Sequence, residues 1–98
     1  IYPEEIEAKI NNMPFVQESL VVEGNGKLIT LIYPDFEAAD KFGLTTADLE
    51  KKMEENRIEA NKELPAYSQL VAVKLYPEEF EKTPKRSIKR FLYQSQAV

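Results

Sequence analysis

Apolar side chains recur with two different periods along this chain, and the change of period predicts where its elements lie. Apolar and β-branched residues dominate positions 16–23 and 27–33, and the turn residues Gly24-Asn25-Gly26 separate the two runs. This arrangement is typical of a β-hairpin. A third run at residues 70–76 predicts another strand, which Pro77 ends.

The first residues of the chain predict a short helix. Pro3 suits a first helical position, and Ile6 and Ile10 follow it one turn apart on a single face. The helix is expected to end near Asn11-Asn12. Its acids at positions 4, 5 and 7 are explained by the favourable place of carboxylates in a first helical turn, rather than by a metal or acid–base cluster.

A longer helix is predicted after the polar stretch that follows Pro34. The Thr45 hydroxyl can cap its first turn, with Asp48 three residues on in a weak form of a capping box. Apolar residues then recur at spacings of four, seven and four until Pro65 ends the helix. Such a stripe is far more typical of a core than of a binding groove. It consists of Leu49, Met53, Ala60 and Leu64.

The order of these elements is typical of a small α+β fold. Three strands and two helices follow one another, and a last short amphipathic helix is expected from the spacing of Ile88, Phe91 and Leu92. Packing the helices on one face of the sheet is the simplest way to bury the apolar faces. We therefore predict one α+β domain with a three-stranded antiparallel sheet and helices packed on it.

Charge divides the chain into an acidic body and a basic end. Residues 1–81 hold all 17 acidic residues and eight basic ones, whereas residues 82–98 hold five basic residues and no acid. The acidic body argues against nucleic acids or an anionic membrane as partners, since both require a broad positive face. The five bases gather around the turn signal Thr83-Pro84, and such a cluster is expected to bind a phosphate group. The alternative is a solvated basic tail that balances acidic neighbours.

The residue types that the chain lacks narrow its chemistry further. Without cysteine or histidine, it has no disulfide, no thiol nucleophile, no imidazole-dependent catalysis and none of the usual zinc sites. No apolar run is long enough to span a bilayer and no signal-peptide pattern is present, so a cytoplasmic location is expected. The start at Ile1, without an initiator methionine, predicts that a larger protein was cut here.

Four segments in a fixed order carry a family resemblance over nearly the whole chain. They are Tyr2-Pro3-Glu4-Glu5-Ile6-Glu7, the hairpin after it, Leu64-Pro65-Ala66-Tyr67, and Lys82-Thr83-Pro84 with Ile88 and Arg90. Together they resemble the C-terminal domain of AMP-forming acyl-CoA synthetases, with the long-chain fatty acid CoA ligases as the closest branch. The resemblance implies that residues 1–98 are the C-terminal AMP-binding-enzyme domain of a larger protein whose N-terminal domain is absent here.

In such a family the intact enzyme joins a carboxylic acid to ATP as an acyl-adenylate, releases pyrophosphate, and passes the acyl group from AMP to coenzyme A. The resemblance implies ATP, Mg²⁺ and coenzyme A for the intact ligase, and a lid domain that rotates between the two steps. Its partner would be its own N-terminal domain, with no nucleic acid. Peripheral membrane association of the full-length enzyme is left open. The 98 residues alone are expected to fold, to bind no cofactor and to have no ligase activity.

The resemblance also indicates catalytic residues, with one departure. The family places its catalytic lysine three residues after the Thr-Pro proline, where this chain has Ser87. We hypothesise that Lys85, the first choice, or Lys89 reaches the α-phosphate instead. The further phosphate or substrate contacts implied are Thr83, Arg86 and Arg90, with no metal ligand. The alternative is that these lysines are ordinary solvated residues.

Two other interpretations remain beside the ligase. One is a stand-alone α+β module that binds a phosphorylated ligand or a partner protein through the basic loop, and the other is a catalytically degraded synthetase domain, which Ser87 favours. Tyr67, Tyr76 and Tyr93 could stack on an adenine or a pantetheine, although half-buried packing is commoner for such residues. A phosphate loop several hundred residues upstream would favour the ligase.

Overall fold

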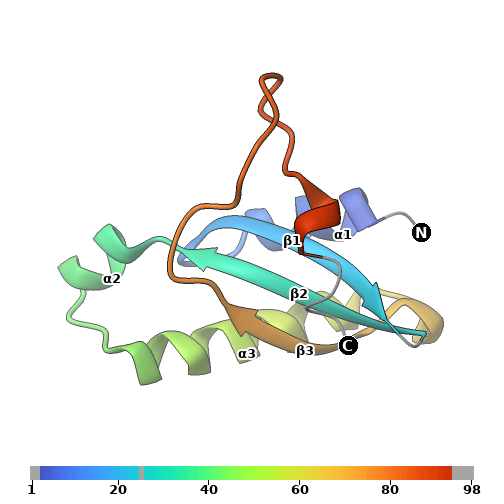
Figure 1. Cartoon of the computed structure of the whole chain (residues 1–98). Coiled ribbons are helices and arrows are strands. Elements are labelled where there is room, and N and C mark those ends of the chain that lie inside the picture. Colours follow the sequence, from blue (N-terminus) through green and yellow to red (C-terminus); the bar gives the residue numbers. More distant parts are fainter. Residues whose placement is uncertain (1–2, 25, 94–98) are drawn as a thin grey trace.

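The chain forms a three-stranded sheet that helices cover on one face and the C-terminal segment covers on the other (Figure 1). The structure is a computed structural model that describes residues 3–24 and 26–93. Three residues that carry parts of the sequence predictions, Ile1, Tyr2 and Asn25, lie outside the described residues. The predicted α+β class, with helices packed on a small sheet, is confirmed.

The predicted hairpin is present. Strands β1 (Val16–Gly24) and β2 (Lys27–Pro34) pair in antiparallel fashion, with Val21 opposite Thr30 and Gly24 opposite Lys27. Gly26 has a positive φ of 74°, a conformation that glycine adopts without steric cost and that a tight turn here requires. The alternating side chains of both strands are divided between two cores, one on each face of the sheet.

The expected antiparallel direction of the third strand is wrong. Strand β3 (Leu70–Leu75) pairs with β2 in parallel, so the sheet is mixed, in the order β1-β2-β3. The reason is the connection, because a strand that is followed by a long crossover helix returns to the end where it began. Helix α3 (Thr46–Lys62) is that crossover, and it packs against β3.

The helices on the sheet form where the apolar spacing predicts them. Helix α1 (Pro3–Asn11) buries Ile6 and Ile10, and α3 begins with a complete capping box between Thr45 and Asp48. The predicted stripe of α3 is buried throughout, and these side chains form one core with α1 and the adjacent face of the sheet. Two short elements were not predicted, namely α2 (Phe36–Lys41) and the 3₁₀ turn η1 (Ala66–Ser68).

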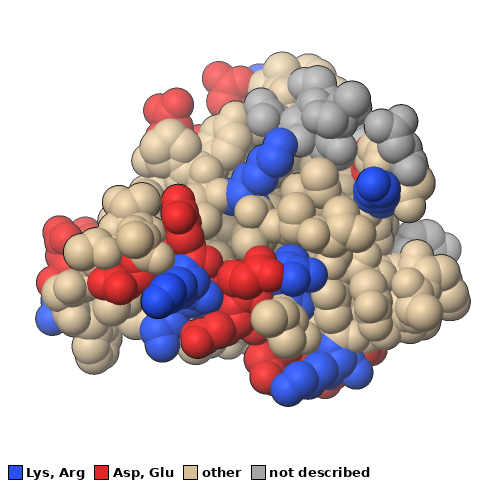
Figure 2. All heavy atoms as spheres, turned by 90° about the horizontal axis from the view of Figure 1, so that it is seen from below, with Lys and Arg blue, Asp and Glu red and all other residues tan. Residues whose placement is uncertain are grey.

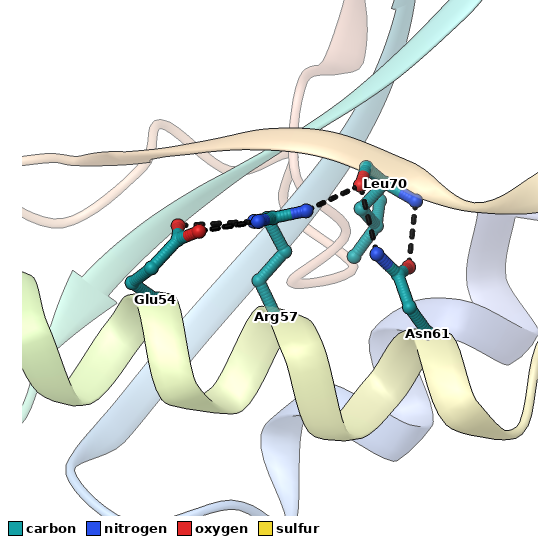
Figure 3. A network of polar contacts seen from close by, with 4 residues as sticks. All are labelled: Glu54, Arg57, Asn61 and Leu70. Carbon is teal, nitrogen blue, oxygen red and sulfur yellow. Dashed lines mark hydrogen bonds and ion pairs between the residues drawn. The ribbon is translucent and has the colours of Figure 1, made fainter.

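Side chains of α3 satisfy the first backbone groups of β3 (Figure 3). The Asn61 side chain accepts a hydrogen bond from the Leu70 N–H at 2.7 Å and donates one to the Leu70 carbonyl at 2.9 Å. Arg57 donates to the same carbonyl at 2.9 Å while it pairs with Glu54. These contacts fix α3 against the edge strand and shield backbone groups that would otherwise be open for pairing.

Acidic and basic side chains are intermixed over part of the face that lies below the view of Figure 1, where α3 runs (Figure 2). This face therefore lacks the single positive field that a nucleic acid would need. Within the two described ranges, no helix is both long and apolar enough to cross a membrane.

Candidate anion-binding hairpin

The basic end of the chain forms a small hairpin that projects from the body (Figure 1, top). Lys82 and Ile88 form an isolated antiparallel bridge, and the Thr83 N–H donates to the Ser87 carbonyl at 2.8 Å. A turn closes the hairpin, since the Arg86 N–H donates to the Thr83 carbonyl at 2.8 Å. Pro84 stands second in this turn, a position that its fixed φ favours.

The predicted amphipathic helix at Ile88 is wrong. The Lys89 N–H donates to the Glu81 carbonyl at 2.9 Å, which extends the hairpin and uses backbone groups that a helix would need. Up to Tyr93, the last residue that the structure describes, a single 3₁₀ turn, η2 (Arg90–Leu92), follows. The side chain of Phe91, which a helix would have buried, is 75% exposed.

The tip of the hairpin carries the exposed cations. Pro84, Lys85, Arg86 and Ser87 are all exposed, and Lys89 near the base is half-buried. Arg86 has a positive φ of 65°, a left-handed conformation that is uncommon for residues with a side chain. Among the described residues, none forms an ion pair with Lys85, Arg86 or Lys89, so three positive charges remain uncompensated here.

The remaining two bases of the cluster pair with acids of the body. Lys82 Nζ lies 2.5 Å from Glu18 Oε2 of β1, and this hydrogen bond raises the pKa of Lys82 above its ordinary 10.5, against the opposing effect of burial. Arg90 Nη2 lies 2.6 Å from Glu7 Oε1 of α1. The cluster of bases is therefore visible in the sequence. Which of its cations are paired and which are unpaired is known only from the structure.

Thr83 and Arg90, which the sequence predicts as substrate contacts, both form hydrogen bonds within this domain. Thr83 Oγ1 accepts a hydrogen bond from the Ser87 N–H at 3.3 Å, so the hydroxyl supports the turn. The Arg90 guanidinium contacts Glu7 and the Val21 carbonyl. The roles proposed for Thr83 and Arg90 in substrate binding stay predictions. Sequence reasoning missed Glu7 and Glu18 as partners, since an acid in a first helical turn or in a strand carries no signal of a distant base.

Three aromatic rings anchor the segment that carries the hairpin. Phe80 precedes the hairpin and Tyr93 follows it, and their ring centroids are 5.1 Å apart in an edge-to-face arrangement. Tyr76 completes the cluster on the sheet face opposite the helices. Burial is the main cause that raises the pKa of Tyr76. The predicted half-buried packing is confirmed for Tyr76, whereas Tyr93 is buried, at 6% exposed, and Tyr67 is 83% exposed.

Neither of two hollows in the surface contains the free cations. One, of about 230 Å³, lies beside α2 at the end of β2, and the other, of about 290 Å³, lies between α1 and η1. In the part of the chain that the structure describes, no group of three acidic, histidine or cysteine residues could hold a metal ion. Lys85 and Arg86 therefore lie outside both hollows, at the exposed tip of the hairpin.

The protein is thus a small α+β domain with exposed cations at the tip of a hairpin, and ion pairs connect this hairpin to the body. A sequence model described as "AMP-binding enzyme C-terminal domain" matches residues 1–96. The chain therefore belongs to this family, and its fold is that of the C-terminal lid of adenylate-forming enzymes. A comparison with curated proteins found no match.

Solved structures of adenylate-forming enzymes share the fold. The adenylation domain of a carboxylate reductase from Mycobacterium chelonae superposes with a TM-score of 0.80 at 16% identity, over 98% of this chain and 16% of that one. A benzoate CoA ligase from Burkholderia xenovorans LB400 gives 0.72 at 20% identity, over 96% and 18% of the two chains. A fatty acyl CoA synthetase from Mycobacterium tuberculosis gives 0.60 at 18% identity, over 97% and 17%.

These neighbours are named for different carboxylic acids, so the shared fold does not favour a particular branch. The chain spans less than a fifth of the length of each of the three proteins. At such identities the comparison concerns the fold alone.

Proposed function

We propose that the intact protein is an AMP-forming, ATP-dependent acyl-CoA ligase and that this domain is its catalytic lid. The observation that carries the proposal is the projecting hairpin, whose tip holds uncompensated cations on a domain of the AMP-binding enzyme family. The hairpin would serve the first half-reaction, in which a carboxylate attacks the α-phosphate of ATP.

The chemistry of that step requires a positioned cation. A carboxylate and a polyphosphate repel each other, and negative charge accumulates on the α-phosphate as the new bond forms. Cations that are held in place before the reaction stabilise this charge without a cost of reorganisation. Lys85, Arg86 and Lys89 supply such charges, and the hydrogen-bonded hairpin fixes the backbone that carries them.

Lys85 is the lysine that we assign to the α-phosphate. It lies at the exposed turn, whereas Lys89 is half-buried at the base of the hairpin, where its N–H binds the Glu81 carbonyl. Ser87, at the position of the family lysine, lies two residues from either lysine and brings no charge. Loss of the acting lysine would lower the adenylation rate by about two to three powers of ten.

The finer features of the proposal follow the family resemblance. We take long-chain fatty acids as the acyl substrate, coenzyme A as the acceptor, and the cytoplasm as the location, with peripheral membrane contact through the rest of the protein. Magnesium would reach the reaction together with ATP. The acyl pocket would lie in the N-terminal domain, against which this lid closes.

The experiment is pyrophosphate release by the native full-length protein with ATP and a series of acids from acetate to palmitate. The proposal predicts release that depends on the acid, is greatest with long chains, and becomes thioester formation when coenzyme A is added. A preference for benzoate or another aromatic acid would contradict the fatty acid assignment but not the ligase. Absence of release with every acid would contradict the ligase itself.

One observation favours a second interpretation, a synthetase domain that has lost its activity. Ser87 replaces the family lysine on an otherwise intact hairpin. Separate Lys85→Ala and Lys89→Ala variants of the full-length protein distinguish the two. A large loss of pyrophosphate release in one of them supports a replacement lysine, whereas an inactive wild-type protein that regains release with Ser87→Lys supports degradation.

A further inference from the structure

Both arms of the hairpin are tied to the body by acid–base pairs. On the first arm, Lys82 Nζ lies 2.5 Å from Glu18 Oε2, and this carboxylate is only 17% exposed. Just beyond the second arm, Arg90 Nη2 lies 2.6 Å from Glu7 Oε1, and the Glu7 side chain is 12% exposed. Partly buried and charge-assisted contacts of this kind are stronger than exposed surface pairs.

The Glu7–Arg90 pair also binds the edge of the sheet. Glu7 Oε2 accepts a hydrogen bond from the Val21 N–H at 2.7 Å, and Arg90 Nη1 donates one to the Val21 carbonyl at 3.3 Å. Because β1 has a neighbouring strand only on the β2 side, these two side chains take the place of a further strand at Val21. One contact group thus connects α1, β1 and the segment that follows the hairpin.

We propose that Glu7 and Arg90 are positioning residues for adenylation, and this inference rests on the proposed function above. They hold the second arm of the hairpin against β1, while Glu18 and Lys82 hold the first arm. The tip cations then meet the polyphosphate in a fixed geometry, and a misplacement by about 1 Å typically costs two powers of ten in rate. Arg90 acts through this framework and does not contact the phosphate.

The pairing of charges supports a positioning role over direct contact. Arg90 is already bonded to a nearly buried carboxylate and to a backbone carbonyl, and Glu4 lies 3.8 Å from the same guanidinium. A phosphate would have to displace these anionic partners to bind Arg90. The uncompensated Lys85 and Arg86 at the tip face no such competition within the described residues.

The test is a double-mutant cycle with Glu7→Gln and Arg90→Gln in the full-length protein. Glutamine matches glutamate in size, and its carbonyl oxygen at position 7 can still accept the Val21 N–H. At position 90 it is shorter than arginine and removes the charge together with both guanidinium contacts. We expect each single variant to lower the kcat of pyrophosphate release about tenfold or more with the KM for ATP within about twofold, and the double variant to be no worse. Arg90→Lys should recover part of the loss, since lysine keeps the charge but not the second hydrogen bond.

A second readout separates positioning from general damage to the fold. Transfer of the acyl group from preformed acyl-adenylate to coenzyme A should be unchanged in the same variants. The matched control is Lys62→Gln, which breaks an exposed ion pair with Glu59 on α3 and should leave both steps unchanged. Normal release by Glu7→Gln beside a large loss in Arg90→Gln would overturn the inference, because Arg90 would then act without its partner. So would losses that multiply in the double variant, or equal losses in both half-reactions.

Hydrogen exchange on the 98-residue chain tests the same contact without any ligase assay. Arg90→Gln should speed exchange at the hydrogen-bonded amides of Thr83, Arg86 and Lys89 by about ten- to a hundredfold, with little change at Leu31 in the sheet. Unchanged exchange at the hairpin would overturn the inference whatever the enzyme does. If the wild-type protein releases no pyrophosphate but Arg90→Gln still speeds exchange at the hairpin, the Glu7–Arg90 pair holds the hairpin as proposed. Only the proposed function would then be contradicted.

Discussion

Removal of the Phe80 side chain should detach the segment that carries the hairpin. Phe80 is 2% exposed and lies on the sheet face opposite the helices, against Leu20, Val22 and Leu31. Its ring centroid is 5.1 Å from that of Tyr93, on the far side of the hairpin. The two rings therefore bring together the residues before and after the loop, so the base of the hairpin depends on Phe80.

The magnitude follows from the burial of the ring. Truncation of a fully buried phenylalanine to alanine costs about 3–5 kcal/mol, the sum of lost transfer free energy and the cavity that remains. A domain of this length has a free energy of unfolding of about 5–15 kcal/mol. Phe80→Ala should therefore remove a large part of the total stability. Phe91→Ala is the matched control, since that ring is 75% exposed and its loss should cost less than about 0.5 kcal/mol.

Urea denaturation followed by circular dichroism measures both variants, because the chain has no tryptophan for fluorescence. We expect a clearly lower midpoint for Phe80→Ala and an unchanged midpoint for Phe91→Ala. If Phe80→Ala costs less than about 1 kcal/mol, or if both variants lose the same amount, then the aromatic anchor described here is not what holds the segment.

Three further predictions concern stability. Thr30→Val should raise the free energy of unfolding by about 1 kcal/mol, since the buried Thr30 hydroxyl has no hydrogen-bond partner among the described residues, and a lower urea midpoint would contradict this. Asn61→Ala should lower it by about 1–3 kcal/mol, because both backbone groups of Leu70 lose a partner, and an unchanged midpoint would show that water replaces the amide. The folded state raises the pKa of Tyr76 above 10.0 and that of Lys82 above 10.5, so it holds these protons more tightly than the unfolded chain. Stability should therefore persist below about pH 10 and fall as the pH rises further, and midpoints at about pH 9 and pH 11 that agree would refute this.

The apolar spacing and the turn and capping residues were enough to predict α3 and the hairpin of β1 and β2. The stripe of α3, its capping box and the hairpin of β1 and β2 are encoded by neighbours within a few residues, and all are present. The direction of β3 was predicted wrongly, because it is set by the long connection from β2 and not by a local pattern. The length of that connection is a signal in the sequence that favours a parallel pair.

The end of the chain shows where periodicity fails. Ile88, Phe91 and Leu92 have helical spacing. The backbone of this segment nevertheless forms the hydrogen bonds of the hairpin, and Tyr93 is buried against the sheet. Helix spacing over so few residues carries little energy, so tertiary contacts decide the outcome. Helix α2 was missed for the converse reason, since a single cap at Asp35 is enough to begin such a short helix.

The candidate site was predictable in composition but not in organisation. A cluster of bases around Thr83-Pro84 is visible in the sequence because charge is a local property. Its division is not, since Arg90 finds Glu7 across a separation of 83 residues. Such a pair depends on the topology of the sheet and on the packing of α1, which no local pattern contains.

Acid-dependent pyrophosphate release tests the role of the hairpin most directly when its three unpaired cations are removed together from the full-length protein. The variant carries alanine at Lys85, Arg86 and Lys89, and a matched control carries alanine at three bases of α3, Lys51, Lys52 and Lys62. We expect release to fall by at least about two powers of ten in the first variant and to stay near the wild-type rate in the control. Release that survives removal of these three cations would contradict the assignment of adenylation to this hairpin.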